Sequence, residues 1–172
     1  MTYHYRARRK LALSGDLPCE EANEYIEKLS HHGFGSQWTT APRCKDLCVP
    51  FVETQQLHPR AEIIRHAAAL LVFSALENGE DTDVTLPDGQ LIDVLIAEGA
   101  GTPVCILGSE ASVRRGRLSI LGQSCSVEDL GIAIVPLLQG DNIPPEDVIS
   151  LQVARMAPAI KDIIRVSRGV SV

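Results

Sequence analysis

Hydrophobic side chains recur at helical spacing between Pro18 and His32. The apolar positions there are Ala22, Tyr25, Ile26 and Leu29. Glutamates occupy the first turn, where the positive end of a helix dipole favours them, and Gly33 follows as a natural C-cap. The pattern therefore predicts an amphipathic helix over Pro18–His32. Before it, the loose alternation over Tyr3–Leu13 predicts a strand.

A longer helical pattern begins at Pro59 and ends at Asn78-Gly79. Its broad apolar face consists of Ile63, Ile64, Ala67, Leu70, Leu71 and Ser74. Between the two predicted helices, glycines and prolines interrupt residues 34–58. Only Leu47–Val52 within that irregular segment has the composition of a short strand.

After residue 79 the hydrophobic residues no longer recur at helical spacing. The sequence predicts three strands there, over Asp83–Leu86, Gln90–Ala97 and Thr102–Leu107. Pro87-Asp88-Gly89 separates the first two, and two glycines separate the second from the third. The sequence therefore predicts a three-stranded antiparallel meander over residues 83–107.

The remaining pattern predicts a helix over Glu110–Leu121, a wholly apolar strand over Ile132–Leu138, and a last helix from Pro144 to Val166. The expected fold class is α/β (α+β), an αβββαβ-type mixed sheet flanked by helices and preceded by a small N-terminal βα segment. We divide the chain into an N-terminal extension, residues 1–58, and an α/β core, residues 59–172, within one compact unit.

The amino-acid composition indicates a globular protein and its expected cellular compartment. Hydrophobic residues make up 45% of the 172 residues, which is typical of a globular protein. No apolar stretch approaches the roughly 20 residues of a membrane span, and no signal peptide follows the N-terminus. We therefore expect a cytoplasmic protein without a membrane partner. The odd number of five cysteines favours reduced thiols over a disulfide framework.

From Pro59 onward the predicted order of helix, three strands, helix, strand and helix resembles the core of the PD-(D/E)xK nuclease-like (restriction-endonuclease-like) superfamily. The residues that carry the resemblance are Glu62 in the first helix and Asp93 on the second strand. The resemblance implies that these carboxylates bind Mg²⁺ or Mn²⁺, which prefer oxygen ligands. The metal would then activate water for phosphodiester cleavage.

The third strand departs from the family pattern. Ile106 and Gly108 stand where the family has a carboxylate and a lysine, and no lysine occurs between Lys45 and Lys161. Under this resemblance Glu110, just beyond the strand, is the candidate for the third catalytic carboxylate. The resemblance thus implies a catalytically degenerate nuclease-fold protein that acts as a nucleic-acid-associated or assembly subunit.

The charge distribution offers one candidate nucleic-acid contact in a chain whose net charge is −6. Arg114, Arg115 and Arg117 lie within the predicted helix over residues 110–121, and a second basic stretch covers residues 6–10. Arginines on one helix suit phosphate contacts. The alternative is an ordinary solvated face.

Other interpretations stay open from the sequence. Asp93 either serves the metal or simply caps a bulge or pairs with an arginine, and Glu62 suits a first helical turn without any ligand. Cys44 and Cys48 do not have the spacing of a structural zinc site, so zinc is not expected. Cys105 lies in an apolar strand, where a thiol is usually inert. A different class of function, a homo-oligomeric protein–protein interaction module without a nucleic-acid role, fits the apolar strand or the last helix as its interface.

Overall fold

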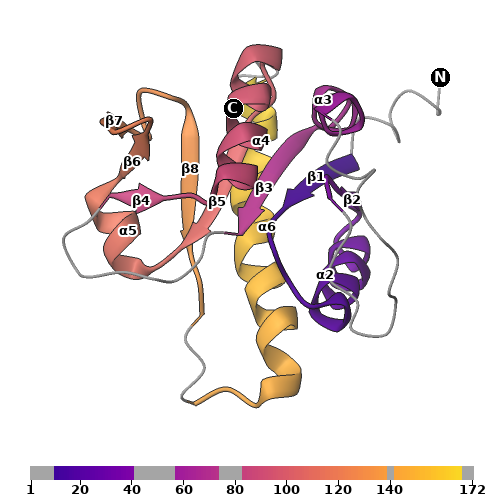
Figure 1. The fold of residues 1–172 in the computed structure, drawn as a ribbon. Helices are drawn as coiled ribbons and strands as arrows, with labels where there is room; N and C mark the ends of the chain where they lie inside the picture. The colour runs from indigo at the N-terminus through magenta and orange to yellow at the C-terminus, as the bar shows by residue number, and fades with distance from the viewer. Residues whose placement is uncertain (1–9, 41–56, 74–82, 139–141, 168–172) are drawn as a thin grey trace.

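The computed structural model describes residues 10–40, 57–73, 83–138 and 142–167. Its centre is a five-stranded sheet in the order β2-β1-β3-β5-β8, in which every neighbouring pair is parallel (Figure 1). The strands are β1 (Lys10–Ser14), β2 (Gly35–Trp38), β3 (Ala69–Phe73), β5 (Val104–Gly108) and β8 (Ile132–Pro136). Numbered by position along the chain, this order is 2-1-3-4-5, one of the two common orders of doubly wound α/β sheets.

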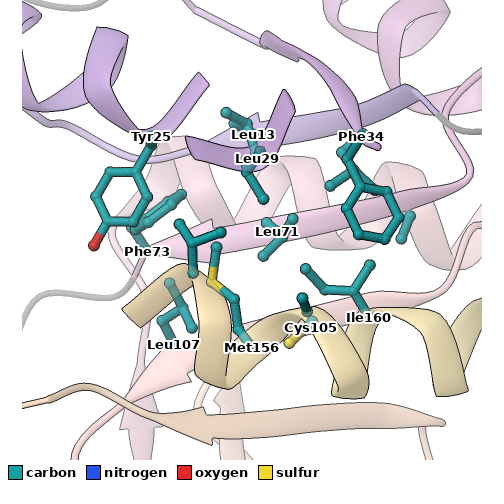
Figure 2. Close-up of a cluster of buried hydrophobic side chains, with 14 of the residues drawn as sticks. Leu13, Tyr25, Leu29, Phe34, Leu71, Phe73, Cys105, Leu107, Met156 and Ile160 are labelled. Carbon is teal, nitrogen blue, oxygen red and sulfur yellow. The ribbon is translucent and has the colours of Figure 1, made fainter. Parts of the chain in front are cut away.

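Two helices cover one face of the sheet. They are α2 (Cys19–His31) and α6 (Val148–Ser167). Because side chains alternate along a strand, every second residue of the sheet points towards these helices. Figure 2 shows Leu13 of β1 and Leu71 of β3 facing Met156 of α6, and all three are fully buried.

The opposite face is covered by two helices and a small sheet. The helices are α3 (Leu57–Arg65) and α4 (Asp88–Ala100). The three-stranded sheet consists of β4 (Val84–Thr85), β6 (Arg117–Ile120) and β7 (Gln123–Ser126), and α5 (Glu110–Arg115) precedes it. Ala12, Val72 and Ile106 point from the main sheet into this second core. The main sheet is therefore buried on both faces, as parallel sheets generally are.

The predicted fold class is confirmed, since helices flank a mixed α/β arrangement of strands. The helix over Pro18–His32 and the apolar strand over Ile132–Leu138 are confirmed as α2 and β8. The last helix is confirmed as well: a short 3-10 turn at Pro145–Asp147 leads into α6, which continues through Pro158. β1 and β2 belong to the same sheet as the later strands, so residues before and after 58 share one core.

The long helix predicted from Pro59 to Asn78 is wrong beyond Arg65. α3 ends there, and Ala69–Phe73 forms β3, the central strand of the main sheet. All five residues of β3 are buried. A short apolar run that is buried on both faces has no period of two, and it can therefore be mistaken for the continuation of a helix.

The strand predicted over Gln90–Ala97 is also wrong, because this segment lies within helix α4. The antiparallel meander is absent from residues 83–107: β4 belongs to the small sheet, and β5 is parallel to both of its neighbours. Asp93 therefore stands on a helix and not on a strand. Pro87 precedes α4 and Gly101 caps its end with a φ of 73°, and these are helix boundaries rather than hairpin turns.

The helix predicted over Glu110–Leu121 is too long. α5 ends at Arg115, and Gly116, with a φ of 61°, turns the chain into β6. Arg117 accordingly lies on a strand. At the N-terminus, β1 begins only at Lys10. The rest of the predicted strand before it and the strand predicted over Leu47–Val52 lie outside the described residues.

The thiols are not all reduced. Cys19 is disulfide-bonded, whereas Cys105 and Cys125 are free. The prediction of reduced thiols is therefore wrong at Cys19.

Within residues 10–40, 57–73, 83–138 and 142–167, no helix combines the length and the apolar character that crossing a membrane requires.

Candidate functional site

The chain changes direction at the carboxyl ends of β1 and β3. β1 continues into α2 on one face of the sheet, whereas β3 leads to α4 on the opposite face. The two strands are neighbours in the sheet, so the chain leaves the sheet towards opposite faces at two adjacent strand ends (Figure 1). In doubly wound sheets, ligands bind outside the carboxyl ends of the strands where the connections part in this way.

Gly15 fits the turn at this point because the end of β3 lies against it. A Cβ atom placed on Gly15 would stand 2.9 Å from Cβ of Phe73, closer than real Cβ contacts come. Phe73 is the last residue of β3. The turn after β1 is therefore packed directly against the end of the central strand.

A buried carboxylate lies beside this turn, on the α4 side of the sheet. Asp93 is completely buried, and its Oδ2 accepts hydrogen bonds from the hydroxyl of Ser14 at 2.5 Å and from that of Thr39 at 2.7 Å. Its Oδ1 accepts from Nε of Arg60 at 2.9 Å and lies 2.8 Å from Nη2 of the same guanidinium. We call these four residues the Asp93 network.

The Asp93 network joins four segments that are distant in sequence. Ser14 ends β1, Thr39 follows β2, Arg60 lies in α3 and Asp93 in α4. Nη2 of Arg60 also donates to the carbonyl oxygen of Gly89 at 2.5 Å, in the first turn of α4. Because every member is buried and bonded, the network fixes the ends of β1 and β2 relative to the start of α4.

Asp93 is paired with an arginine, as one of the alternatives left open by the sequence expected. Glu62 has different neighbours. It is half-exposed on α3, where its oxygens lie 3.2 Å from Nη1 of Arg65 and 3.1 Å from Nε2 of His66. Glu62 and Asp93 therefore share no bonding partner.

Glu62 also lies towards the other end of β1. It lines a hollow of about 220 Å³ together with Lys10, the first residue of β1, whereas Asp93 bonds to Ser14, the last. A strand rises about 3.3 Å per residue, so these two residues of β1 are on the order of 13 Å apart. The predicted metal pair is thus divided between the two ends of the strand.

Glu110 is exposed at the start of α5. No cluster of three or more acidic, cysteine or histidine side chains suitable for a metal occurs in the described part of the chain. Cys44 and Cys48, the residues considered for zinc, lie outside the described residues. Burial raises the pKa of the Cys105 thiol to about 12, so the thiolate that a nucleophilic cysteine needs does not form near neutral pH.

The three arginines of the candidate nucleic-acid contact have different environments. Arg114 is exposed on α5, while Nε of Arg115 donates to Asp83 at 2.7 Å and Nε of Arg117 donates to the hydroxyl of Ser124 at 2.6 Å. Hydrogen bonds from Ser124 and Arg115 hold the pKa of the Asp83 carboxyl below its usual value. Arg115 and Arg117 thus also tie α5 and β6 to the strands around them.

Sequence patterns drew attention to Asp93 but missed the other three residues of the network. Nothing in the local sequence pattern distinguishes Ser14, Thr39 or Arg60 as a partner of Asp93. The members are 33 to 79 positions from Asp93 in sequence. The only local signal is a serine at the end of a buried strand, followed by a glycine.

We predict that Gly15→Ala lowers the free energy of unfolding by about 1–3 kcal/mol, because its methyl group would overlap with Phe73. Shortening the phenylalanine ring cannot relieve the contact, since the atom in question is Cβ. Denaturant unfolding would measure the loss. Gly35→Ala is the matched control: no atom lies within 4 Å of the added Cβ, so the expected change is near zero. Equal effects of the two variants would contradict the close contact.

No family model matches the chain, and no curated protein matches it. Among solved structures, the chain is similar to a CMP N-glycosidase from Clostridium botulinum, with a TM-score of 0.47 and 10% identity over 88% of this chain and 98% of that one. It is also similar to an oxidoreductase from Corynebacterium diphtheriae, with a TM-score of 0.47 and 13% identity over 96% of this chain and 100% of that one. Identities this low say nothing about a shared substrate or reaction.

Proposed function

We propose that the protein binds a small ligand of the nucleotide class at the carboxyl edge of the main sheet, between β1 and β3. The observation that carries the proposal is the buried Asp93 network beside the point where the chain connections part. Doubly wound sheets bind mononucleotides and dinucleotides at this point.

The energetics of the network support a positioning role. A buried ion pair often stabilises a fold no better than well-packed apolar side chains of the same volume would. Arg60 and Asp93 are both buried, whereas the other ion pairs of the described residues are more exposed. A buried charged network at the proposed ligand-binding edge of the sheet serves to hold the ends of β1 and β2 in one arrangement. The start of α4, held through Gly89, is one of the segments positioned in this way.

Two buried threonines at opposite edges of the molecule provide a matched test. Thr39 donates to Asp93 at the carboxyl edge, and Thr102 donates to the carbonyl oxygen of Ile64 at 3.0 Å beside the start of β5. Each Thr→Val variant loses one buried hydrogen bond, which costs about 1 kcal/mol. We expect similar losses of stability from both, but weaker ligand binding only from Thr39→Val.

The measurement is the shift in melting temperature of the wild-type protein with nucleoside monophosphates, nucleosides, ribose 5-phosphate and inorganic phosphate. A ligand at 100 times its Kd stabilises the native state by about 2.7 kcal/mol, which is easily detected. Titration calorimetry with the best ligand then compares the two valine variants. No shift with any compound, or equal weakening in both variants, would contradict the proposed site.

The nuclease-like role, with Mg²⁺ or Mn²⁺ held by Glu62 and Asp93 and a catalytically degenerate centre, is still a prediction from the sequence. So are a nucleic-acid partner and a homo-oligomeric or other protein partner. Labelled DNA and RNA with Mn²⁺ belong in the same set of compounds, since cleavage that requires both carboxylates would favour the nuclease role over the ligand site. The cytoplasmic location is likewise a prediction, and the disulfide at Cys19 is the observation against it, because cytosolic disulfides are rare.

A further inference from the structure

Cys19 is the first residue of α2, and its sulfur is disulfide-bonded. The side chain is partly exposed, so thiols in solution have access to it. Cys105 and Cys125 are free. The chain contains five cysteines, and elimination therefore pairs Cys19 with Cys44 or Cys48.

Two features of α2 favour negative charge on the sulfur of Cys19. The first is its position at the start of a helix of 13 residues, where the helix dipole is positive and the N-cap residue, Pro18, supplies no side-chain hydrogen bond. The second is Asn23, whose Nδ2 donates to Sγ of Cys19 at 3.6 Å. Glu20 and Glu21 oppose a negative charge there, but both are exposed, so water and salt weaken their repulsion.

The hydrogen bond from Asn23 is expected to strengthen when the disulfide opens. A disulfide sulfur is a neutral and weak acceptor, whereas a thiolate is charged, and hydrogen bonds to charged groups are roughly twice as strong as those between neutral groups. The amide is already in place while the disulfide is closed. The surroundings of Cys19 therefore stabilise the product of reduction more than the disulfide. A stabilised thiolate leaves faster and makes its disulfide easier to reduce.

We propose that Cys19 is a site of thiol–disulfide exchange with small thiols. The thiolate of one thiol molecule attacks the partner sulfur, the bond to Cys19 breaks, and Cys19 leaves as a thiolate. A second thiol molecule then displaces the partner cysteine from the mixed disulfide. The protein gains two electrons and two protons, and the two thiol molecules become one disulfide. No ligand of the proposed nucleotide site takes part, so the two proposals stand or fall separately.

Peptide mapping of the unreduced protein tests the bond itself. Free thiols are alkylated in denaturant before digestion, and trypsin cleaves after Lys45, which separates Cys44 from Cys48. We expect mass spectrometry to find Cys19 joined to one of these two cysteines. Cys19 alkylated as a free thiol, or joined to a cysteine outside this pair, would overturn the inference.

Glutathione is the probe for exchange in the folded protein. A structural disulfide resists reduction by glutathione, whereas an exchangeable one is reduced. We expect an excess of reduced glutathione, without denaturant, to free Cys19. In samples quenched with acid at early times, the mixed disulfide should be on Cys44 or Cys48. Glutathione attached to Cys19 would overturn its role as the leaving group. A bond that stays closed at every ratio of reduced to oxidised glutathione would overturn the exchange site.

Asn23→Ala tests the stabilisation of the thiolate. Asn23 is exposed, so the variant is expected to fold, which circular dichroism checks. Loss of the hydrogen bond should shift the equilibrium with glutathione about fivefold towards the disulfide. Asn142→Ala is the matched control, because Asn142 is an exposed asparagine outside α2, and it should leave the equilibrium unchanged. The same equilibrium constant in the wild type and Asn23→Ala would overturn the role of the amide.

Discussion

Replacing Asp93 by alanine is expected to lower the free energy of unfolding by about 3–5 kcal/mol. The substitution leaves the guanidinium of Arg60 buried without its counter-charge, and two hydroxyls lose their acceptor. An unpaired buried charge lowers the free energy of unfolding by more than the intact ion pair adds to it. Urea unfolding with a constant m-value would measure the loss.

Glu62→Ala is the matched control for this variant. It also removes a carboxylate from an ion pair, but both partners of Glu62 are largely exposed, and such pairs contribute about 0–1 kcal/mol. A metal site built on both carboxylates would instead make the two variants respond alike to added Mn²⁺. A loss below about 1 kcal/mol for Asp93→Ala would show that the network carries little of the stability of the fold.

A double substitution separates the charge from the packing. Arg60→Met combined with Asp93→Leu removes both charges and fills the space with apolar atoms. We expect the double variant to be more stable than the sum of the two single losses implies, because no unpaired charge remains. If the pair serves mainly to position the ligand site, this variant folds and binds ligand more weakly than the wild type.

The sequence predicts an element correctly where all of its local signals favour the same secondary structure. α2 has a single apolar face, acidic residues in its first turn and a glycine after its end, and each of these signals favours the same helix. β8 is a short apolar run between turns. Local propensity and tertiary packing agree in these elements, so the prediction of each was correct.

The errors occur where hydrophobic residues follow one another without a clear period. In α4, apolar residues run almost continuously from Leu91 to Ala97: the helix packs against the main sheet and α3, yet Leu95 within the run is 43% exposed. A continuous apolar run of this length does not distinguish a buried helix from a buried strand. The deciding residues are Pro87 and Gly101, which suit the two ends of a helix as well as the turns of a hairpin.

The candidate site could not be assembled from the sequence for a related reason. A hydrogen bond between Ser14 and Asp93 depends on the pairing of β1 with β3 and on the packing of α4 against both strands. Neither contact can be predicted from the spacing of residues along the chain.

The second large effect is expected at β3, where the predicted helix and the observed strand lead to different outcomes. Leu71 points into the core beneath α2 and α6, and Val72 points into the core beneath α3 and α4. Both are fully buried. We expect Leu71→Ala to cost about 2–5 kcal/mol and Val72→Ala about 1–3 kcal/mol, from lost burial and the cavities left behind.

An amphipathic surface helix over the same residues would give a different result. The helical face predicted from Ile63 to Ser74 includes Leu71 and leaves out Val72, so Val72→Ala would then cost little. Leu121→Ala is the control for either arrangement, because Leu121 is 82% exposed and its truncation should change stability by less than about 0.5 kcal/mol. Large losses at both neighbouring positions of β3, measured by the shift of the denaturant midpoint at constant m-value, require a strand buried on both faces. That burial is what makes β3 the fixed centre against which the turn at Gly15 and the start of α4 are held.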